Sequence, residues 1–480
     1  MNTKVSAKIC MFRLNELGDC FLITFTAGKS SSRLLIDCGS FRNTGPSIQR
    51  IKQIVGELGK KLDKKPLDVV VGTHQHNDHL SGFVHCEKPF EKLKVQEVWL
   101  SWLDDPTDRK AREIGKAHHN LRLQLATVRD ILQPMVKGKT KTRPTAARAF
   151  EVLDDMLGFD GAATEGPPDV PARGVKILKS IGQKKSEPEY LRPGRTLQMP
   201  GLPSGTVRVH VLGPPRVEGV ERKNDPLYRI DPKKGESYDP SLAAATLHAS
   251  KFLDAVQRTK GVSAFREEDY PFNQRYKRTA KSSANLRTLI KRYGGRTEAW
   301  RKIDDDWLQQ GGALALYLNN FTNNSSLVLA IELVESGKVL LFAADAQTGN
   351  WDSWKDVKWE NTDVKTDDLL KRTVFYKVGH HASHNATLVE VFEKMNSPDL
   401  VALIPVHKQD PNITKANGWR MPAKNLFNRL KEKTSHRVLQ MDNENPPDCD
   451  PAKSPAKESW KKVGITPTIT NNTIEIEIDG

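Results

Sequence analysis

Cysteine is scarce in this chain of 480 residues, and its five cysteines form no CxxC pair. Five is an odd number, so the thiols cannot close into a complete set of disulfides. Three of them lie in apolar, strand-like segments, where a thiol behaves as a small hydrophobe (Cys10, Cys20 and Cys38). We therefore expect reduced, buried thiols and a reducing compartment.

Long apolar runs are also missing. No stretch approaches the roughly 20 residues that a membrane-spanning helix needs. The N-terminal sequence MNTKVSAKICMFRLNELGD meets polar residues before any apolar segment of signal-peptide length. The hydrophobic share of 37% and the charged share of 28% are typical of a folded chain with polar insertions. These features predict a cytoplasmic protein with no membrane partner.

Acidic residues are in deficit, because 59 Asp and Glu face 74 Lys and Arg, for a net charge of +15. Clustered basic residues gain affinity for polyanions by releasing counterions from phosphates. The stretch RYKRTAKSSANLRTLIKRYGGR, within residues 223–302, interleaves Tyr276 and Tyr293 with basic residues, as sites for single-stranded nucleic acid do. A solvated helix face gives the same pattern. Charge alone leaves both interpretations open.

Strand and helix patterns alternate along the two ends of the chain. Residues 8–39 predict a meander of short strands, residues 47–61 a helix, and residues 67–71 a buried strand. Further strands are expected at 95–102, 206–212, 326–333, 338–345, 373–378 and near the C-terminus. We therefore expect an α/β core made of residues 1–103, 206–222 and 311–480, with a helical insertion or cap at 104–205 and a basic insertion or lid at 223–310.

Polar side chains capable of binding metal follow the strand at 67–71. His74 and His76 are two residues apart, so the strand period places both imidazoles on one face, where they can share an ion. Asp78 and His79 follow as the chain turns, and can serve a second ion. Imidazole and carboxylate together suit zinc, iron or manganese better than calcium.

The pattern HxHxDH of residues 74–79 resembles the signature of the metallo-β-lactamase superfamily. The resemblance implies an αββα sandwich in which Asp37, in an Asp-x-Gly turn, supports the histidine loop. It also implies that Asp345 bridges two ions, and that either His380 or His381 is the last ligand. The segments NNSSLVL, KVGHHAS and IEIEI are similar to the metallo-β-lactamase-like domain of ComEC competence proteins and its soluble relatives.

One ligand of that superfamily has no counterpart here. Members commonly supply another histidine before the bridging aspartate, whereas this chain has Gly213 at the corresponding strand end. His210 is near, but strand alternation points it elsewhere. The first ion would then be held by only His74, His76 and Asp345, with water or a residue from an insertion completing it. We therefore expect weak or lost occupancy of that position. The later histidines His384 and His407 are expected to lie outside the site.

The resemblance implies a hydrolase with two divalent ions, zinc or manganese, which generate hydroxide at neutral pH. Asp78 and Asp37 would serve catalysis, Asp37 by orienting a ligand histidine. Candidates to neutralise charge on the attacked group are Ser383, Lys377 or a residue of the basic insertion. With the basic charge, this predicts a phosphodiesterase or nuclease acting on nucleic acid or nucleotides.

Two alternatives remain at this point. A hydrolase of thioesters, lactones or amides would have a closed apolar pocket built by residues 104–200. An effector or binding subunit, controlled by a regulatory protein partner, would have an incomplete metal site. The oligomeric state cannot be predicted from the sequence.

Overall fold

The computed structural model describes residues 4–137, 144–161, 169–182, 187–216, 242–259, 274–276, 278, 283–293, 308–360, 363–416 and 418–480. Contacts divide the chain into two compact units. One comprises Met1–Lys116, Gly158–Ser241 and Asn319–Gly480, and the other comprises Ala117–Leu157 and Leu242–Leu318. The first unit contains all the strands of the described chain.

The first unit is built on two sheets. The eight-stranded sheet has the order β14-β15-β1-β2-β3-β4-β5-β6. Its strands are β1 (Val5–Phe12), β2 (Phe21–Ala27), β3 (Ser30–Ile36), β4 (Leu67–Gly72), β5 (Val95–Ser101), β6 (Glu189–Leu191), β14 (Thr468–Ile469) and β15 (Thr473–Asp479). Pairing is antiparallel from β14 to β3 and parallel from β3 to β6. The β1–β15 pair joins the two ends of the chain.

The seven-stranded sheet has the order β13-β12-β11-β10-β9-β8-β7. Its strands are β7 (Thr196–Gln198), β8 (Val207–Gly213), β9 (Val328–Leu333), β10 (Lys338–Phe342), β11 (Thr373–Lys377), β12 (Val401–Ile404) and β13 (Val438–Gln440). The strands from β10 to β13 are parallel, so the loops after β10 and β11 leave the same edge of the sheet.

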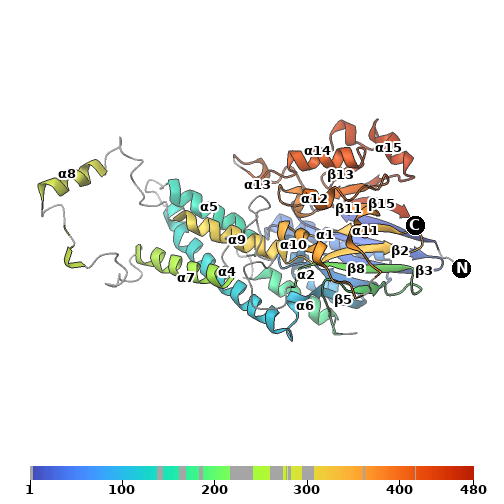
Figure 1. The fold of residues 1–480 in the computed structure, drawn as a ribbon, viewed down its shortest axis with the longest axis horizontal. Coiled ribbons are helices and arrows are strands. Elements are labelled where there is room, and N and C mark those ends of the chain that lie inside the picture. Colours follow the sequence, from blue (N-terminus) through green and yellow to red (C-terminus); the bar gives the residue numbers. More distant parts are fainter. Residues whose placement is uncertain are drawn as a thin grey trace. The chain divides into compact units, whose positions relative to one another are not determined.

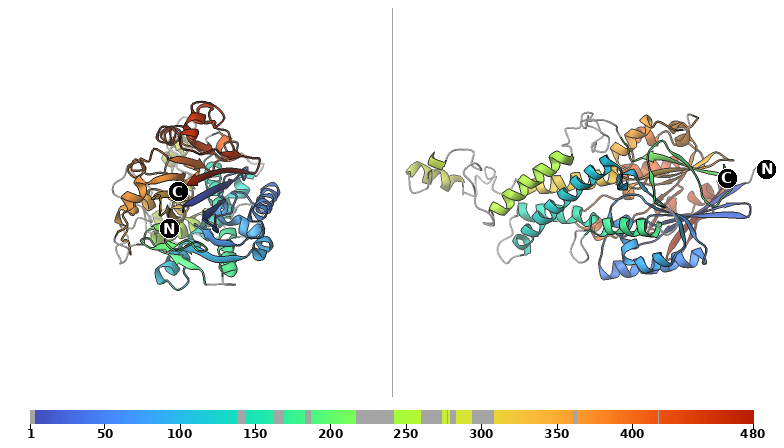
Figure 2. Two further views of the ribbon diagram at one scale, coloured as in Figure 1. Left: turned by 90° about the vertical axis from the view of Figure 1, so that its right-hand side faces the viewer. Right: turned by 90° about the horizontal axis from the view of Figure 1, so that it is seen from below.

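One hydrophobic core cluster contains side chains of both sheets. Phe21 of β2 and Phe342 of β10, for example, meet edge to face with ring centroids 5.9 Å apart. Helices α1 (Gly45–Leu62), α2 (Asn77–His85) and α6 (Val170–Gly182) lie on one side of the sandwich, and α10 (Thr348–Ser353), α11 (Thr366–Lys371) and α12 (Val389–Phe392) on the other (Figure 2). Further helices of this unit are α3 (Glu87–Lys92), α13 (Pro411–Thr414), α14 (Lys424–Lys433) and α15 (Ala456–Lys462). The predicted α/β sandwich is confirmed.

The second unit is helical in the described part of the chain. It takes residues from α4 (Arg109–Lys137), α5 (Pro144–Phe159), α7 (Leu242–Thr259), α8 (Ala284–Tyr293) and α9 (Gln309–Asn324) (Figure 1). Its helices pack closely, because a Cβ added to Gly312 of α9 would lie 3.0 Å from Val152 of α5. Most of the basic insertion at 223–310 lies outside the described residues, and the boundaries of both insertions stay predictions.

Two further expectations concern composition. All five cysteines are buried and unpaired in the structure. No helix among the described residues has the length and apolar character required to cross a lipid bilayer.

Candidate metal centre

The loop that carries the histidines is fixed by a turn after β3. The Asp37 carboxylate accepts hydrogen bonds from the Thr73 backbone N–H at 2.9 Å and from its hydroxyl at 2.7 Å. Two residues on, Gly39 lies so close to α2 that an added Cβ would be 2.5 Å from the backbone nitrogen of His79. Only glycine allows this approach. The Asp-x-Gly turn therefore sets the start of α2 against the end of β4.

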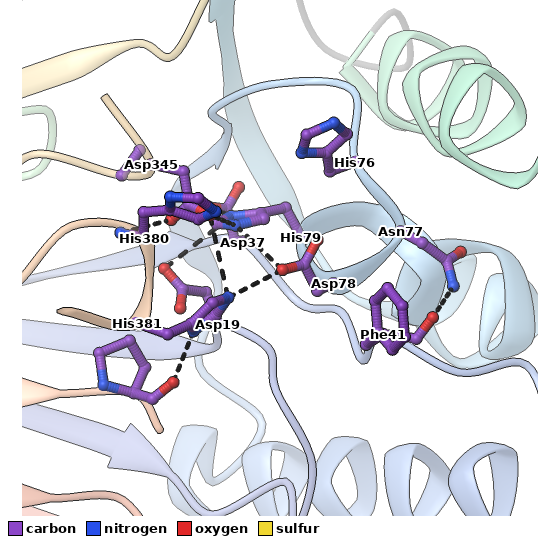
Figure 3. Close-up of polar contacts among 12 residues, drawn as sticks. Asp19, Asp37, Phe41, His76, Asn77, Asp78, His79, Asp345, His380 and His381 are labelled. Carbon is purple, nitrogen blue, oxygen red and sulfur yellow. Dashed lines mark hydrogen bonds and ion pairs between the residues drawn. The ribbon is translucent and has the colours of Figure 1, made fainter. Parts of the chain in front are cut away.

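Four side chains from three segments meet beside that turn. Asp78 and His79 come from the first turn of α2, Asp345 follows β10, and His381 follows β11. One ligand atom from each lies within 4.8 Å of all the others, and all four side chains are buried (Figure 3). His381 Nε2 lies 2.9 Å from Asp78 Oδ2, and His79 Nε2 lies 3.3 Å from Asp345 Oδ2.

Hydrogen bonds fix which ring nitrogen of each histidine faces the cluster. His79 Nδ1 donates to Asp37 Oδ2 at 2.7 Å, and His381 Nδ1 donates to the Pro405 carbonyl at 2.6 Å. Both rings therefore turn Nε2 inward. The buried atoms His79 Nε2, Asp78 Oδ1 and Asp345 Oδ2 have no hydrogen-bond partner. Since buried polar atoms are rarely left unpaired, these donors fit a divalent cation.

Charge and burial compete in setting the pKa values of the cluster. Burial opposes ionisation of Asp345, but His79 and then Lys377 hold its pKa well below the usual value. Burial also opposes protonation of His79, yet the carboxylates of Asp345, Asp37 and Asp78 raise its pKa well above the usual value. The carboxylates thus attract positive charge to this point, as a cation site requires.

Sequence reasoning missed a buried ion pair next to the cluster. Lys377 Nζ contacts the Asp19 carboxylate, lies 3.3 Å from Asp345 Oδ1 and donates to the Ala344 carbonyl at 2.9 Å. Asp19 and Lys377 are both buried. The available signals were the strand break at Gly18-Asp19 and a lone charge in the apolar strand β11, neither of which indicates a partner. The Lys377 ammonium is thus engaged by the carboxylates of Asp19 and Asp345.

His74 and His76 lie together beside the four-residue group, and the ring centroids of His74 and His79 are 4.1 Å apart. His74 Nε2 and His76 Nδ1 are 3.1 Å apart, close enough to bind one ion together. Among the described residues, neither joins a group of three or more potential ligands within 4.8 Å of one another. Burial lowers the pKa of His76 to about 4 against the opposing effect of the Asp78 carboxylate, so its ring is neutral at pH 7.

The structure separates His380 from His381, a choice that the sequence left open. His381 joins the four-residue group, whereas the His380 ring contacts Ser383 Oγ at 2.7 Å, Gln347 Nε2 at 3.2 Å and Asn323 Nδ2 at 3.4 Å. The backbone N–H of His380 donates to Asp345 Oδ1 at 3.1 Å. Ser383, considered above as a charge-neutralising residue, is therefore a neighbour of His380.

The part of the chain that carries the HxHxDH pattern matches a known protein family. The sequence profile described as Metallo-beta-lactamase superfamily matches residues 15–124. This segment belongs to that superfamily. It contains Asp37 and the whole HxHxDH pattern. A search of curated proteins finds no match, and the closeness to the ComEC-type domain is not confirmed.

Gly213, where the sequence led us to expect a missing ligand, lies against Asn350. A Cβ added to Gly213 would lie 2.2 Å from Asn350 Oδ1, so the Asn350 amide fills the space. His210, on the same strand, contacts Glu332 Oε2 at 3.2 Å and Thr196 Oγ1 at 3.0 Å.

The two later histidines lie outside the group as well. His384 is exposed and His407 is partly buried, and neither belongs to a metal-ligand group of the described chain.

Proposed function

We propose that this protein is a metal-dependent phosphodiesterase or nuclease that acts on nucleic acids or nucleotides. The hydrolase part rests on one observation, the buried group of Asp78, His79, Asp345 and His381, whose ligand atoms converge and three of whose polar atoms have no hydrogen-bond partner. A divalent ion held there supplies hydroxide at neutral pH and positive charge for the attacked group.

The residues around the group hold these ligands in place. Asp37 orients His79, and the Pro405 carbonyl orients His381. Lys377 and the His380 N–H engage one oxygen of Asp345 and leave Oδ2 directed at the histidines. Such outer contacts fix ring tautomers and ligand orientation, and their loss typically lowers metal affinity about 10–100-fold.

The substrate class rests on charge, because the fold alone hosts many hydrolytic reactions. A net charge of +15 favours association with a polyanion and accelerates its encounter with the site. A phosphodiester group carries a negative charge, whereas a thioester or lactone group does not. Charge therefore supports phosphodiester hydrolysis over the alternative substrates.

The test is a parallel assay of purified protein with added Mn²⁺ or Zn²⁺ on bis-p-nitrophenyl phosphate, single-stranded DNA, duplex DNA, RNA and cyclic nucleotides. We expect turnover of at least one of these phosphodiesters. The double variant Asp78→Ala/His79→Ala should abolish it, because it removes two of the four ligands.

The exposed histidine His384 provides the matched control, and His384→Ala should retain activity. Unchanged turnover in the double variant would refute the assignment of the site. Turnover of thioester or lactone substrates alone, with none on phosphodiesters, would refute the substrate class and leave the hydrolase assignment intact.

A further inference from the structure

The histidines and aspartates of the HxHxDH pattern belong to two groups of potential ligands of unequal size. The larger group, Asp78, His79, Asp345 and His381, offers four ligand atoms to one position. The smaller group consists of His74 Nε2 and His76 Nδ1, which are 3.1 Å apart. A zinc site is usually completed by three or four protein ligands. Of these two groups, only the larger meets that number.

Asp345 is poorly placed to complete the smaller group. Its Oδ1 already faces Lys377 Nζ at 3.3 Å and the His380 N–H at 3.1 Å. Its Oδ2 faces His79 Nε2 at 3.3 Å and His381 Nε2 at 3.8 Å. Among the described residues, Asp345 forms no group with His74 and His76 in which all ligand atoms lie within 4.8 Å of one another. The carboxylate therefore serves the larger group.

The space next to Gly213, where the resemblance places the missing histidine, is filled by the side chain of Asn350. Its amide nitrogen donates to the carbonyls of Asn324 and Ser326, both at 2.9 Å. Its amide oxygen accepts from Trp354 Nε1 at 2.9 Å. Asn350 is fully buried, so its side chain is held by three hydrogen bonds and is not free to turn toward an ion. A side chain at Gly213, where the superfamily resemblance places a further ligand for the smaller group, would thus meet a rigid neighbour.

We propose that the two positions fill in a fixed order. The first ion binds Asp78, His79, Asp345 and His381, and a second binds His74 and His76 at least about tenfold more weakly, since even the loss of an outer contact costs 10–100-fold in affinity. At metal concentrations between the two dissociation constants the protein holds one ion. This inference rests on the metal centre of the proposed function and adds the order of its occupancy.

The test is a titration of metal-free, full-length protein with Mn²⁺, followed by calorimetry and by electron paramagnetic resonance. We expect two steps, with the signal of isolated Mn²⁺ at one equivalent. His381→Ala should remove the tight step, and His76→Ala should remove only the weak one. His384→Ala, three residues from His381 and exposed, should keep both steps.

Circular dichroism checks that each variant is folded, and His74→Gln replaces His76→Ala if that variant is not. The order is overturned by two steps of equal affinity, by a spin-coupled pair at one equivalent, or by loss of the tight step in His76→Ala. Those results leave a metal-dependent hydrolase standing. If neither Mn²⁺ nor Zn²⁺ binds, the proposed function fails together with the order.

Discussion

The two oxygens of Asp345 lie in different surroundings. Oδ1 faces the ammonium of Lys377 and a backbone N–H, whereas Oδ2 faces two imidazoles and has no hydrogen-bond partner. Lys377 is itself held by Asp19, and burial of that pair excludes water that could solvate either charge. The lysine therefore balances two carboxylates that would otherwise repel each other in a dry interior.

Lys377→Met tests this balance. Removal of one partner from a buried ion pair typically costs about 3–5 kcal/mol, because the remaining charge is left unpaired. We expect the single variant to lose stability in that range, as measured by urea unfolding of metal-free protein. Burial opposes protonation of Lys377, but Asp19 and Asp345 raise its pKa above the usual value, so the charge is present throughout the neutral range.

The matched variant is Asp19→Asn/Lys377→Met, which removes both charges. It should be more stable than the sum of the two single changes predicts, since directly paired residues are not additive. Additive losses of stability across the cycle would show that Lys377 and Asp19 act independently.

At the scale of helices and strands, hydrophobic periodicity predicted the elements that the local sequence determines. Ile51, Ile54, Val55 and Leu58 predicted a helix over 47–61, and α1 spans Gly45–Leu62 with all four of them buried. The apolar run after Leu67 predicted a buried strand, and β4 is buried along its length. Segments such as α9, whose polar end contacts His380, gave no comparable signal because their role depends on distant parts of the chain.

Glu332 of β9 links two further strand regions and makes stability depend on pH. The hydrogen bond from His210 lowers the pKa of Glu332 to about 2. Arg372 acts in the same direction, and burial opposes both. Because the pKa of Glu332 is lower in the folded state, its ionised carboxylate stabilises the protein at pH values above the unfolded-state pKa of about 4.3. This contribution is lost as the pH falls toward 2. Glu332→Gln should therefore lower the melting temperature at pH 7, with a difference that shrinks below about pH 4.3.

Thermal unfolding of both proteins between pH 7 and pH 3.5 measures this difference. Glu335→Gln, at an exposed position in the following turn, is the control and should match the parent protein at every pH. A Glu332→Gln difference that stays constant with pH would contradict a contribution from the ionised carboxylate.

Across the whole first unit, the metal centre joins segments that are distant in sequence. Asp78 and His381 are 303 positions apart, yet their side chains lie 2.9 Å from each other. The sequence predicted the residue types through the HxHxDH pattern and the strand ends. It could not choose between His380 and His381, because that choice depends on how the loop after β11 turns. His380, His381 and Ala382 all have positive φ angles there, a conformation that strand or helix periodicity does not predict.

Because the ligands come from both sheets, an ion bound by them should stabilise the folded unit as a whole. A ligand that binds only the native state adds about 2.7 kcal/mol when its free concentration is 100 times the dissociation constant. We expect Mn²⁺ or Zn²⁺ to raise the melting temperature of protein first stripped with EDTA, and to do so progressively with concentration. Asp78→Ala should abolish the shift while His384→Ala retains it. An equal shift in the Asp78→Ala protein would mean that the stabilising ion binds elsewhere, because this variant lacks one of the four ligands of the group.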